Sequence, residues 1–390
     1  MSLAYKKERE IVPQYSLTGD LLSYLRCGLQ YRYQSGSDLP PSRPVQLWFG
    51  EFVHGVLESA YRLWRASKPS FPWPCNQTIW RQPPPPGRQL HDIGLIGDMV
   101  EGTLRARGKN PRSGAARDSA YLRAEKAINE LGPHLFPLIS SAEERVIGTR
   151  NIPQIVTGAS NHRATLYELH GIIDVVTNVE LSESPSDNII RVALQNAIPS
   201  AVGEFEVVVD YKGSRRPPTD HAYWEQGEWQ LQTYAWLRRR QPGSLPIAAG
   251  VLLYINELAP GIDDLNQLKR DIKKKITDVV PKPGGADDYK LNTWNSKAAI
   301  PDFSKDFRTA RAIRIVPFNE ASQTNATGKF DATVLDIENR VSAEAASGAI
   351  FGNWTPCGDE ETCAACDFRH FCPDPFPRSG PHVIKTPPAP

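Results

Sequence analysis

The chain has 390 residues, and its 45 basic and 44 acidic side chains give a formal net charge of +1. This length can bury a large hydrophobic core, while the balanced charge excludes a globally basic surface, so any nucleic-acid-binding site must be local. The chain has only six cysteines, and its N-terminus is charged, which argues against a secreted protein. It also lacks an apolar run long enough to span a bilayer, which argues against a membrane protein. These features predict a reducing, cytoplasmic location.

The first half of the chain predicts three helices and one irregular stretch. Leucine spacing predicts a helix over residues 16–34, begun by Ser16 or Thr18, and a stronger helix over 47–64. Seven prolines between residues 69 and 87 exclude regular structure there. A third helix is expected over 115–131.

The second half mixes expected strands with helices. Residues 166–176 and 205–212 alternate like strands, 224–240 has helical periodicity, and 250–255 predicts a buried strand. The polar segment near 181–203 and the charged, weakly periodic segment 256–330 predict insertions, as does the proline-rich region near 66–115. The prolines of residues 376–390 predict a disordered tail.

Asp210 and Lys212 lie two residues apart at the end of an expected strand, so they share one face of it. Phosphodiester hydrolysis needs a hard oxygen ligand for a divalent cation and a nearby positive charge, which this pair could supply. The alternative is an exposed, salt-bridged strand end, since Asp-x-Lys is common by chance.

Asp174 lies inside the apolar run of the preceding strand, where an unpaired carboxylate is costly. It therefore needs a metal, a neighbouring arginine or backbone amides. If the two strands pair, Asp174 and Asp210 can face each other and hold one ion between them.

Two helices carry further candidates. His54 shares a helix face with apolar residues, which indicates either a hydrogen-bonded core histidine or a metal ligand, and Gly50 would let another backbone approach closely. Gln230, Tyr234 and Arg238 follow one another at four-residue spacing and form one stripe. Such a stripe indicates either an amphipathic surface helix or contacts to a nucleic-acid strand.

Three thiols near the C-terminal end have the spacing C-x2-C-x5-C, at Cys363, Cys366 and Cys372. A fourth candidate, Cys27, lies more than three hundred residues upstream, and Cys357 is a possible substitute. Four thiolates suit zinc or an iron–sulfur cluster. A shared site would bring both ends together, so we expect one domain over residues 1–375 with insertions.

The order of these motifs resembles the RecB-type branch of the PD-(D/E)XK nuclease superfamily. In particular, it resembles the members with a four-cysteine iron–sulfur cluster, the CRISPR adaptation nuclease and the AddB nuclease domain. The similarity covers about half of the chain and rests on six motifs in order: Cys27, Gly50-x3-His54, Gly171-x2-Asp174, Asp210-x-Lys212, Gln230-x3-Tyr234 and Cys363-x2-Cys366-x5-Cys372.

The resemblance implies an α/β fold, with a central mixed sheet flanked by helices, and a Mg2+- or Mn2+-dependent deoxyribonuclease. It makes Lys212 the catalytic lysine, acting with Asp210 and Asp174. The implied metal ligands are His54, Asp174, Asp210 and the Tyr211 backbone carbonyl. The expected substrate is single-stranded or end-opened DNA, which an exonuclease would degrade.

The resemblance also assigns the remaining motifs. Gln230 and Tyr234 become strand-contacting residues, and we add Arg238 to them as a DNA-binding candidate. The four cysteines Cys27, Cys363, Cys366 and Cys372 become ligands of a [4Fe–4S] cluster, with structural zinc as the alternative. No GxxxxGK[ST] phosphate loop is present, so any helicase partner would be a separate protein. DNA repair and antiviral defence both use such enzymes.

Two alternatives remain. One is a catalytically silent nuclease fold that serves as a DNA-binding or scaffold subunit, although the intact Asp174, Asp210 and Lys212 argue against it. The other is a zinc-stapled binding protein whose carboxylates are structural. Iron content separates the cluster from zinc, and a cleavage assay separates an enzyme from a scaffold.

Overall fold

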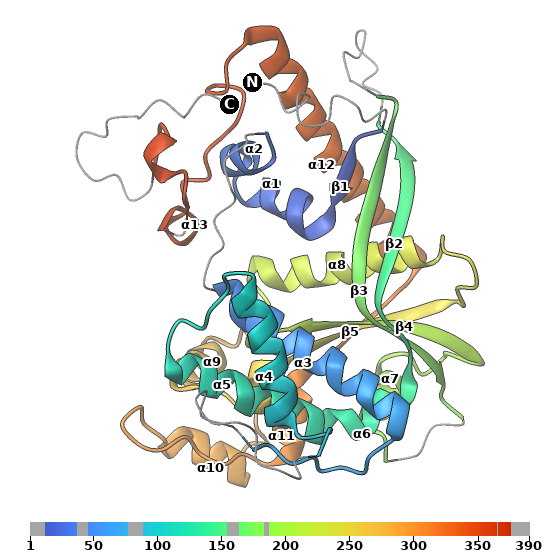
Figure 1. The fold of residues 1–390 in the computed structure, drawn as a ribbon, viewed down its shortest axis with the longest axis vertical. Coiled ribbons are helices and arrows are strands. Elements are labelled where there is room, and N and C mark those ends of the chain that lie inside the picture. The colour runs from blue at the N-terminus through green and yellow to red at the C-terminus, as the bar shows by residue number, and fades with distance from the viewer. Residues whose placement is uncertain are drawn as a thin grey trace.

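The computed structural model describes residues 12–36, 46–76, 89–153, 164–182, 187–364 and 366–375. In these residues a six-stranded mixed sheet lies between two layers of helices (Figure 1). The strands are β1 (Gln14–Ser16), β2 (Ile139–Asn151), β3 (Leu166–Glu180), β4 (Glu204–Lys212), β5 (Ile247–Tyr254) and β6 (Ile313–Pro317). The expected α/β fold with a mixed sheet is confirmed.

The longest strand, β3, organises the sheet. It pairs along one edge with β2, antiparallel, and along the other edge first with β1, parallel, and then with β4, antiparallel. The sheet continues through β5, parallel to β4, and β6, antiparallel to β5.

One layer of helices packs on the face of the sheet that carries Val207, Val209 and Tyr211. Its apolar residues come mainly from α3, α4 and α5, in the lower part of Figure 1. The helices in and around this layer are α3 (Gln46–Ser67), α4 (Ile93–Ala106), α5 (Gly114–Lys126), α6 (Gly132–Leu135), α7 (Ile189–Ala197), α9 (Ile262–Lys274), α10 (Ala286–Thr293) and α11 (Lys305–Ala312).

The second layer covers the opposite face, where Val208 points, and joins both ends of the described chain. Its helices are α1 (Leu22–Arg26), α2 (Gly28–Gly36), α8 (Ala222–Arg238), α12 (Glu320–Ser347) and α13 (Glu360–Ala364). Figure 1 shows α1 and α2 beside α12. The Leu29 amide donates to the Thr355 carbonyl at 3.1 Å, and the rings of Tyr33 and Phe368 stack at 5.2 Å.

Most of the expected elements are present, with three differences. The helix expected over 16–34 begins with a π-helical turn and is interrupted at Cys27, whose extended backbone separates α1 from α2. The range 66–115, expected to be an insertion, contains the helix α4 after its irregular first part. The range 256–330 contains β6, which belongs to the sheet. The expected tail, 376–390, lies outside the described residues.

Among the described residues, no helix combines the length and the hydrophobicity needed to cross a bilayer.

Candidate active site

The site forms where β3 stops pairing with β1 and starts pairing with β4. Pairing of β3 with β1 ends at His170, and pairing with β4 begins at Val175. The intervening Gly171–Asp174 stretch is therefore unpaired on that edge in the described structure. Asp174 lies in this unpaired stretch, and its Oδ2 accepts a hydrogen bond from the Tyr211 backbone N–H at 2.8 Å. The two strands thus separate at the acidic residues.

Gly171 at the start of this opening is required by packing. A Cβ placed there would lie 2.8 Å from Cε1 of Tyr234, whose buried ring comes from α8. Contacts this short force a neighbour to move, so Gly171 allows α8 to lie close to β3. The Gly-x2-Asp motif therefore combines a packing residue with a site residue.

His54 reaches the same opening from α3. Its Nδ1 lies 3.4 Å from Asp174 Oδ1, and its Nε2 donates a hydrogen bond of 2.8 Å to the Tyr211 carbonyl oxygen. A Cβ at Gly213 would lie 3.3 Å from the Gly50 Cα, so α3 contacts the end of β4 there. The expectation for Gly50 was wrong in detail, because a Cβ on Gly50 itself would meet no atom within 4 Å.

Asp210, Lys212 and Gln230 form a closed triangle beside this group. Lys212 Nζ lies 2.7 Å from Asp210 Oδ2 and donates to Gln230 Oε1 at 2.5 Å, while Gln230 Nε2 donates to Asp210 Oδ1 at 2.8 Å. Gln230 Nε2 also lies 3.3 Å from the Tyr234 hydroxyl. Gln230 therefore orients both the lysine and the aspartate.

Arg238, the last residue of the expected stripe, lies apart from this group. Its guanidinium donates to Glu206 at 2.8 and 2.7 Å and also pairs with Glu144. These two carboxylates engage the side chain within the protein. The structure thus joins Gln230 and Tyr234 to the site but not Arg238.

Burial and neighbouring charges shift the protonation of the site. Burial lowers the pKa of His54, but the carboxylates of Asp174 and Asp210 outweigh this effect and raise it to about 9. Burial raises the pKa of Asp210, and Asp174 adds to the rise, although Lys212 and His54 favour the charged form. His54 therefore holds a proton at neutral pH, which a metal ion would have to displace.

Glu143 on β2 is a site residue that the sequence interpretation missed. Burial, together with the charge of Asp174, raises the pKa of its carboxyl group to about 7. One ligand atom from each of His54, Glu143 and Asp174 lies within 4.8 Å of the others. Nothing in the surrounding charged sequence distinguished Glu143 from Glu144.

A cavity of about 570 Å3 adjoins the triangle of Asp210, Lys212 and Gln230. Lys212 and Gln230 line it, together with Arg26 from α1, Arg215 from the segment after β4, and Tyr223 near the start of α8. Arg215 pairs with Asp271 at 2.7 Å, whereas Arg26 is exposed and forms no ion pair within the described ranges. The cavity thus places positive charge and an aromatic ring next to Lys212.

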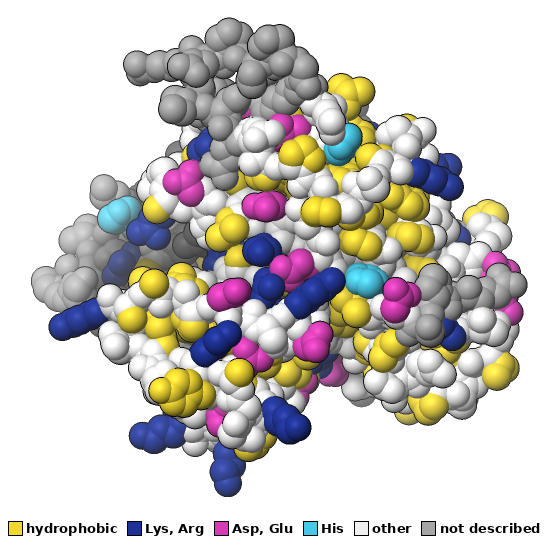
Figure 2. Space-filling model, turned by 90° about the horizontal axis from the view of Figure 1, so that it is seen from below, with side chains coloured by type: hydrophobic (Ala, Val, Ile, Leu, Met, Phe, Trp, Pro, Cys, Tyr) yellow, Lys and Arg dark blue, Asp and Glu magenta, His cyan; other side chains and the backbone are white. Residues whose placement is uncertain are grey.

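The surface seen in Figure 2 intersperses basic and acidic side chains. This face shows no broad field of one sign, in agreement with the net charge of +1. The positive charge of the cavity is therefore local.

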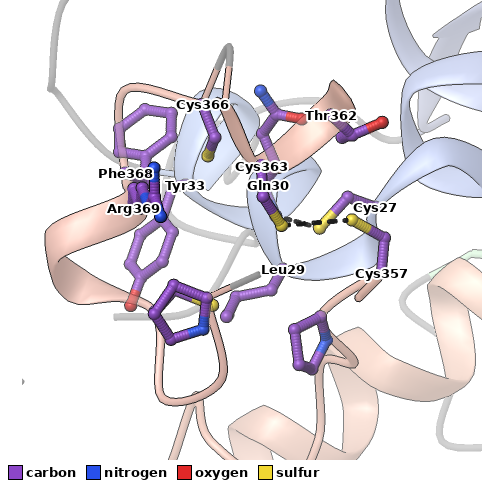
Figure 3. A pocket seen from close by; sticks show the side chains of 13 residues that line it. Cys27, Leu29, Gln30, Tyr33, Cys357, Thr362, Cys363, Cys366, Phe368 and Arg369 are labelled. Carbon is purple, nitrogen blue, oxygen red and sulfur yellow. Dashed lines mark hydrogen bonds between the residues drawn. The ribbon is translucent and has the colours of Figure 1, made fainter. Parts of the chain in front are cut away.

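A second pocket holds the clustered cysteines. It is lined by Cys27, Cys357, Cys363, Cys366 and Cys372, which come from both ends of the described chain. Figure 3 shows the sulfur atoms of Cys27, Cys357 and Cys363 pointing toward one another. The Sγ atoms of Cys357 and Cys363 are 3.8 Å apart.

The chemistry of this pocket fits a thiophilic metal or cluster. Burial raises the pKa of Cys366 to about 12 and also raises the pKa values of Cys357 and Cys372, with further contributions from neighbouring thiols. Thiols crowded in this way stay protonated unless a metal displaces the protons. The donor set suits zinc or an iron–sulfur cluster. Cys75 does not line the pocket.

Comparison with known families gives one match. Residues 19–184 and 201–373 match the family model of the PD-(D/E)XK nuclease superfamily. The matched ranges include the strands of the site and both halves of the cysteine pocket. No curated protein matches the chain.

Proposed function

Because the chain belongs to the PD-(D/E)XK nuclease superfamily, we propose that it is a metal-dependent nuclease that hydrolyses phosphodiester bonds of DNA. One observation carries this proposal: His54, Asp174 and the Tyr211 carbonyl converge where β3 and β4 separate, beside the Asp210–Lys212 pair. This arrangement combines oxygen and nitrogen ligands with an amine, as the chemistry requires.

In this proposal His54, Asp174, Asp210 and the Tyr211 carbonyl hold one Mg2+ or Mn2+ ion. When bound, the ion supplies a Lewis acid for a phosphate oxygen and for the attacking water. The ligand set suits either cation, because carboxylate and carbonyl oxygens bind both and the imidazole also binds Mn2+.

Lys212 orients the attacking water and offsets the negative charge that develops on the phosphate. Asp210 and Gln230 hold the ammonium group at 2.7 and 2.5 Å, so its position does not depend on the substrate. Tyr234 in turn positions Gln230 through a contact of 3.3 Å. The catalytic amine is thereby fixed before a strand binds.

The cavity beside Lys212 binds the nucleic-acid strand. Arg26 and Arg215 contact phosphates there, and Tyr223 can stack on a base, a combination that does not require a specific sequence. We therefore assign single-stranded DNA or opened duplex ends as the substrate and exonucleolytic cleavage as the activity, as in the RecB-type branch. Arg238 has no part in this contact.

Cys27, Cys363, Cys366 and Cys372 hold a [4Fe–4S] cluster in this proposal, with zinc as the alternative. Its task is mechanical, because it ties α1 and α2 to the C-terminal segment. A reducing, cytoplasmic location keeps the thiols available for the cluster. A helicase that opens duplex DNA would be a separate partner.

A cleavage assay with end-labelled single- and double-stranded DNA, in Mg2+ or Mn2+, tests the proposal. Lys212→Ala should lower the cleavage rate at least about 100-fold, because it removes the charge that stabilises the transition state. Lys282→Ala removes an exposed lysine that does not line the cavity and should leave the rate unchanged. Equal activity of Lys212→Ala and the wild type would refute the assigned site.

A further inference from the structure

Glu143 occupies an unusual position in the sheet. Its neighbours Ala142 and Glu144 pair with Val175 and Ile173, so Glu143 lies opposite Asp174 on the adjacent strand. Its backbone has φ of +53°, which non-glycine residues rarely adopt within a strand. Like charges directly opposite each other destabilise antiparallel strands. The imidazole of His54 beside Asp174 offsets this repulsion only while it is protonated, and a bound divalent cation would offset it as well.

A third carboxylate follows on the other side of Asp174. The pairing of β3 with β4 ends at Val175 and Val209, and the next residues on the two strands are Asp174 and Asp210. Glu143, Asp174 and Asp210 thus lie in a row across three neighbouring strands. Lys212 and Gln230 engage Asp210, but Glu143 has no hydrogen bond or ion pair within the part of the chain that the structure describes.

The Glu143 carboxylate is placed to share an ion with His54 and Asp174. The three ligand atoms lie within 4.8 Å of one another. Ligands at 2.0–2.1 Å from a cation lie at most about 4.2 Å apart, so small side-chain rotations would close the set. Asp210 is not part of this group of three.

We propose that Glu143 is a further metal ligand, which completes with His54 and Asp174 a position for one divalent cation beside the Asp210–Lys212 pair. This assignment rests on the proposed nuclease function, since the ion serves the same site. An imidazole donor next to two carboxylates favours Mn2+ over Mg2+.

Titration with Mn2+ of protein that has been freed of Mg2+ and Mn2+ but keeps the group bound by its cysteines, followed by the electron paramagnetic resonance of the unbound ion, tests the assignment without cleavage. Glu143→Gln should raise the Kd for Mn2+ at least about tenfold, since loss of even an outer-shell partner weakens a site about 10–100-fold. Glu168→Gln is the matched control. Glu168 lies on β3 six residues before Asp174, where it pairs with Gln14 and Thr149, so its loss should change the Kd less than about twofold.

Thermal unfolding distinguishes a ligand from a structural residue. Without metal, Glu143→Gln should be at least as stable as the wild type, because the substitution relieves the repulsion from Asp174. With Mn2+, its Tm should rise less than that of the wild type. A variant that is destabilised equally with and without Mn2+ would show a structural role and overturn the assignment.

The two proposals fail differently. If Glu143→Gln binds Mn2+ like the wild type while Asp174→Asn loses both binding and DNA cleavage, the Glu143 assignment is wrong and the nuclease site stands. If the wild type neither binds Mn2+ nor cleaves DNA, the proposed function fails and the Glu143 assignment fails with it.

Discussion

His54 lies between two hydrogen-bond acceptors, the Asp174 carboxylate at 3.4 Å and the Tyr211 carbonyl at 2.8 Å. Both favour the protonated imidazole, and together with the charge of Asp210 they outweigh the effect of burial and raise the pKa of His54 to about 9. An imidazole binds a metal only in its neutral form, and the ion therefore competes with this proton.

Mn2+ binding should strengthen as the pH rises from about 6.5 toward 9. The proton that must leave His54 is bound throughout this range and is lost only near the raised pKa. Isothermal titration at several pH values in this interval measures the effect, and His54→Gln should flatten it above about pH 7, below which the proton of Glu143 also competes with the ion. A Kd of the wild type that does not change with pH would contradict the assigned histidine ligand.

The same shift affects the stability of the metal-free protein. Because the folded pKa of His54 lies above its ordinary value of 6.5, the protonated imidazole stabilises the fold fully below that value. This contribution is lost as the pH rises through about 9. The metal can restore it, since it replaces the proton between the same acceptors.

At the scale of elements, a buried ion pair joins α2 to α12. Arg32 donates to the two carboxylate oxygens of Glu344 at 2.7 and 2.6 Å, and both side chains are at most 2% exposed. The Trp354 indole N–H donates to the same carboxylate at 2.7 Å. The pair therefore connects the N-terminal helices with the segment that leads to the cysteines.

Arg32→Met should destabilise the protein by about 3–5 kcal/mol, because Glu344 would remain buried without its cation. The double variant Arg32→Met/Glu344→Gln should recover part of this loss, since glutamine can still accept from Trp354 without a charge. Urea unfolding of the wild type, both single variants and the double variant measures the coupling. A double variant that is less stable than Arg32→Met would contradict this account.

The two strands that carry the site, β3 and β4, were predictable because they are apolar and flanked by turn residues. In contrast, β2 was missed: its sequence is rich in charged and polar residues, and only Val146 and Gly148 are buried. β6 was missed because its five residues lie in a charged region and join the sheet only by pairing with β5. Pairing between distant strands has no signal in local periodicity.

The site residues were predictable as types and spacings but not as contacts. Asp210-x-Lys212 follows from the period of a strand, and Gln230-x3-Tyr234 from that of a helix. Glu143 could not be found, because it enters the site only through its register with Asp174. Arg238 fits the helical stripe equally well, but the sequence does not reveal Glu206 and Glu144 next to it.

At the scale of the whole molecule, the helices of the second layer and the cysteine pocket join segments that are about 340 residues apart in the sequence. Closure of so long a loop restricts the unfolded chain, so a metal or cluster bound by these thiols stabilises the folded state. The stability of the fold should therefore depend on the content of the pocket.

Under the proposed cluster assignment, Cys27→Ser should lose iron and lower the Tm by at least about 5 °C, because the N-terminal helices lose their metal-mediated link to the C-terminal segment. Cys75→Ser is the matched control, since Cys75 lies outside the pocket. Iron, sulfide and zinc analysis of anaerobically purified protein, with thermal unfolding, provides the measurement. Zinc without iron in the wild type would exclude the cluster, and an unchanged iron content in Cys27→Ser would exclude this ligand.

Adjacent residues of the chain serve the two pockets: Arg26 lines the cavity at Lys212, and Cys27 lines the cysteine pocket. Under the proposed function, a group bound by the cysteines would fix the residue next to Arg26, so its loss would also disturb one side of the cavity beside Lys212. Assembly of the cysteine site and binding of nucleic acid would then be coupled through a single peptide bond.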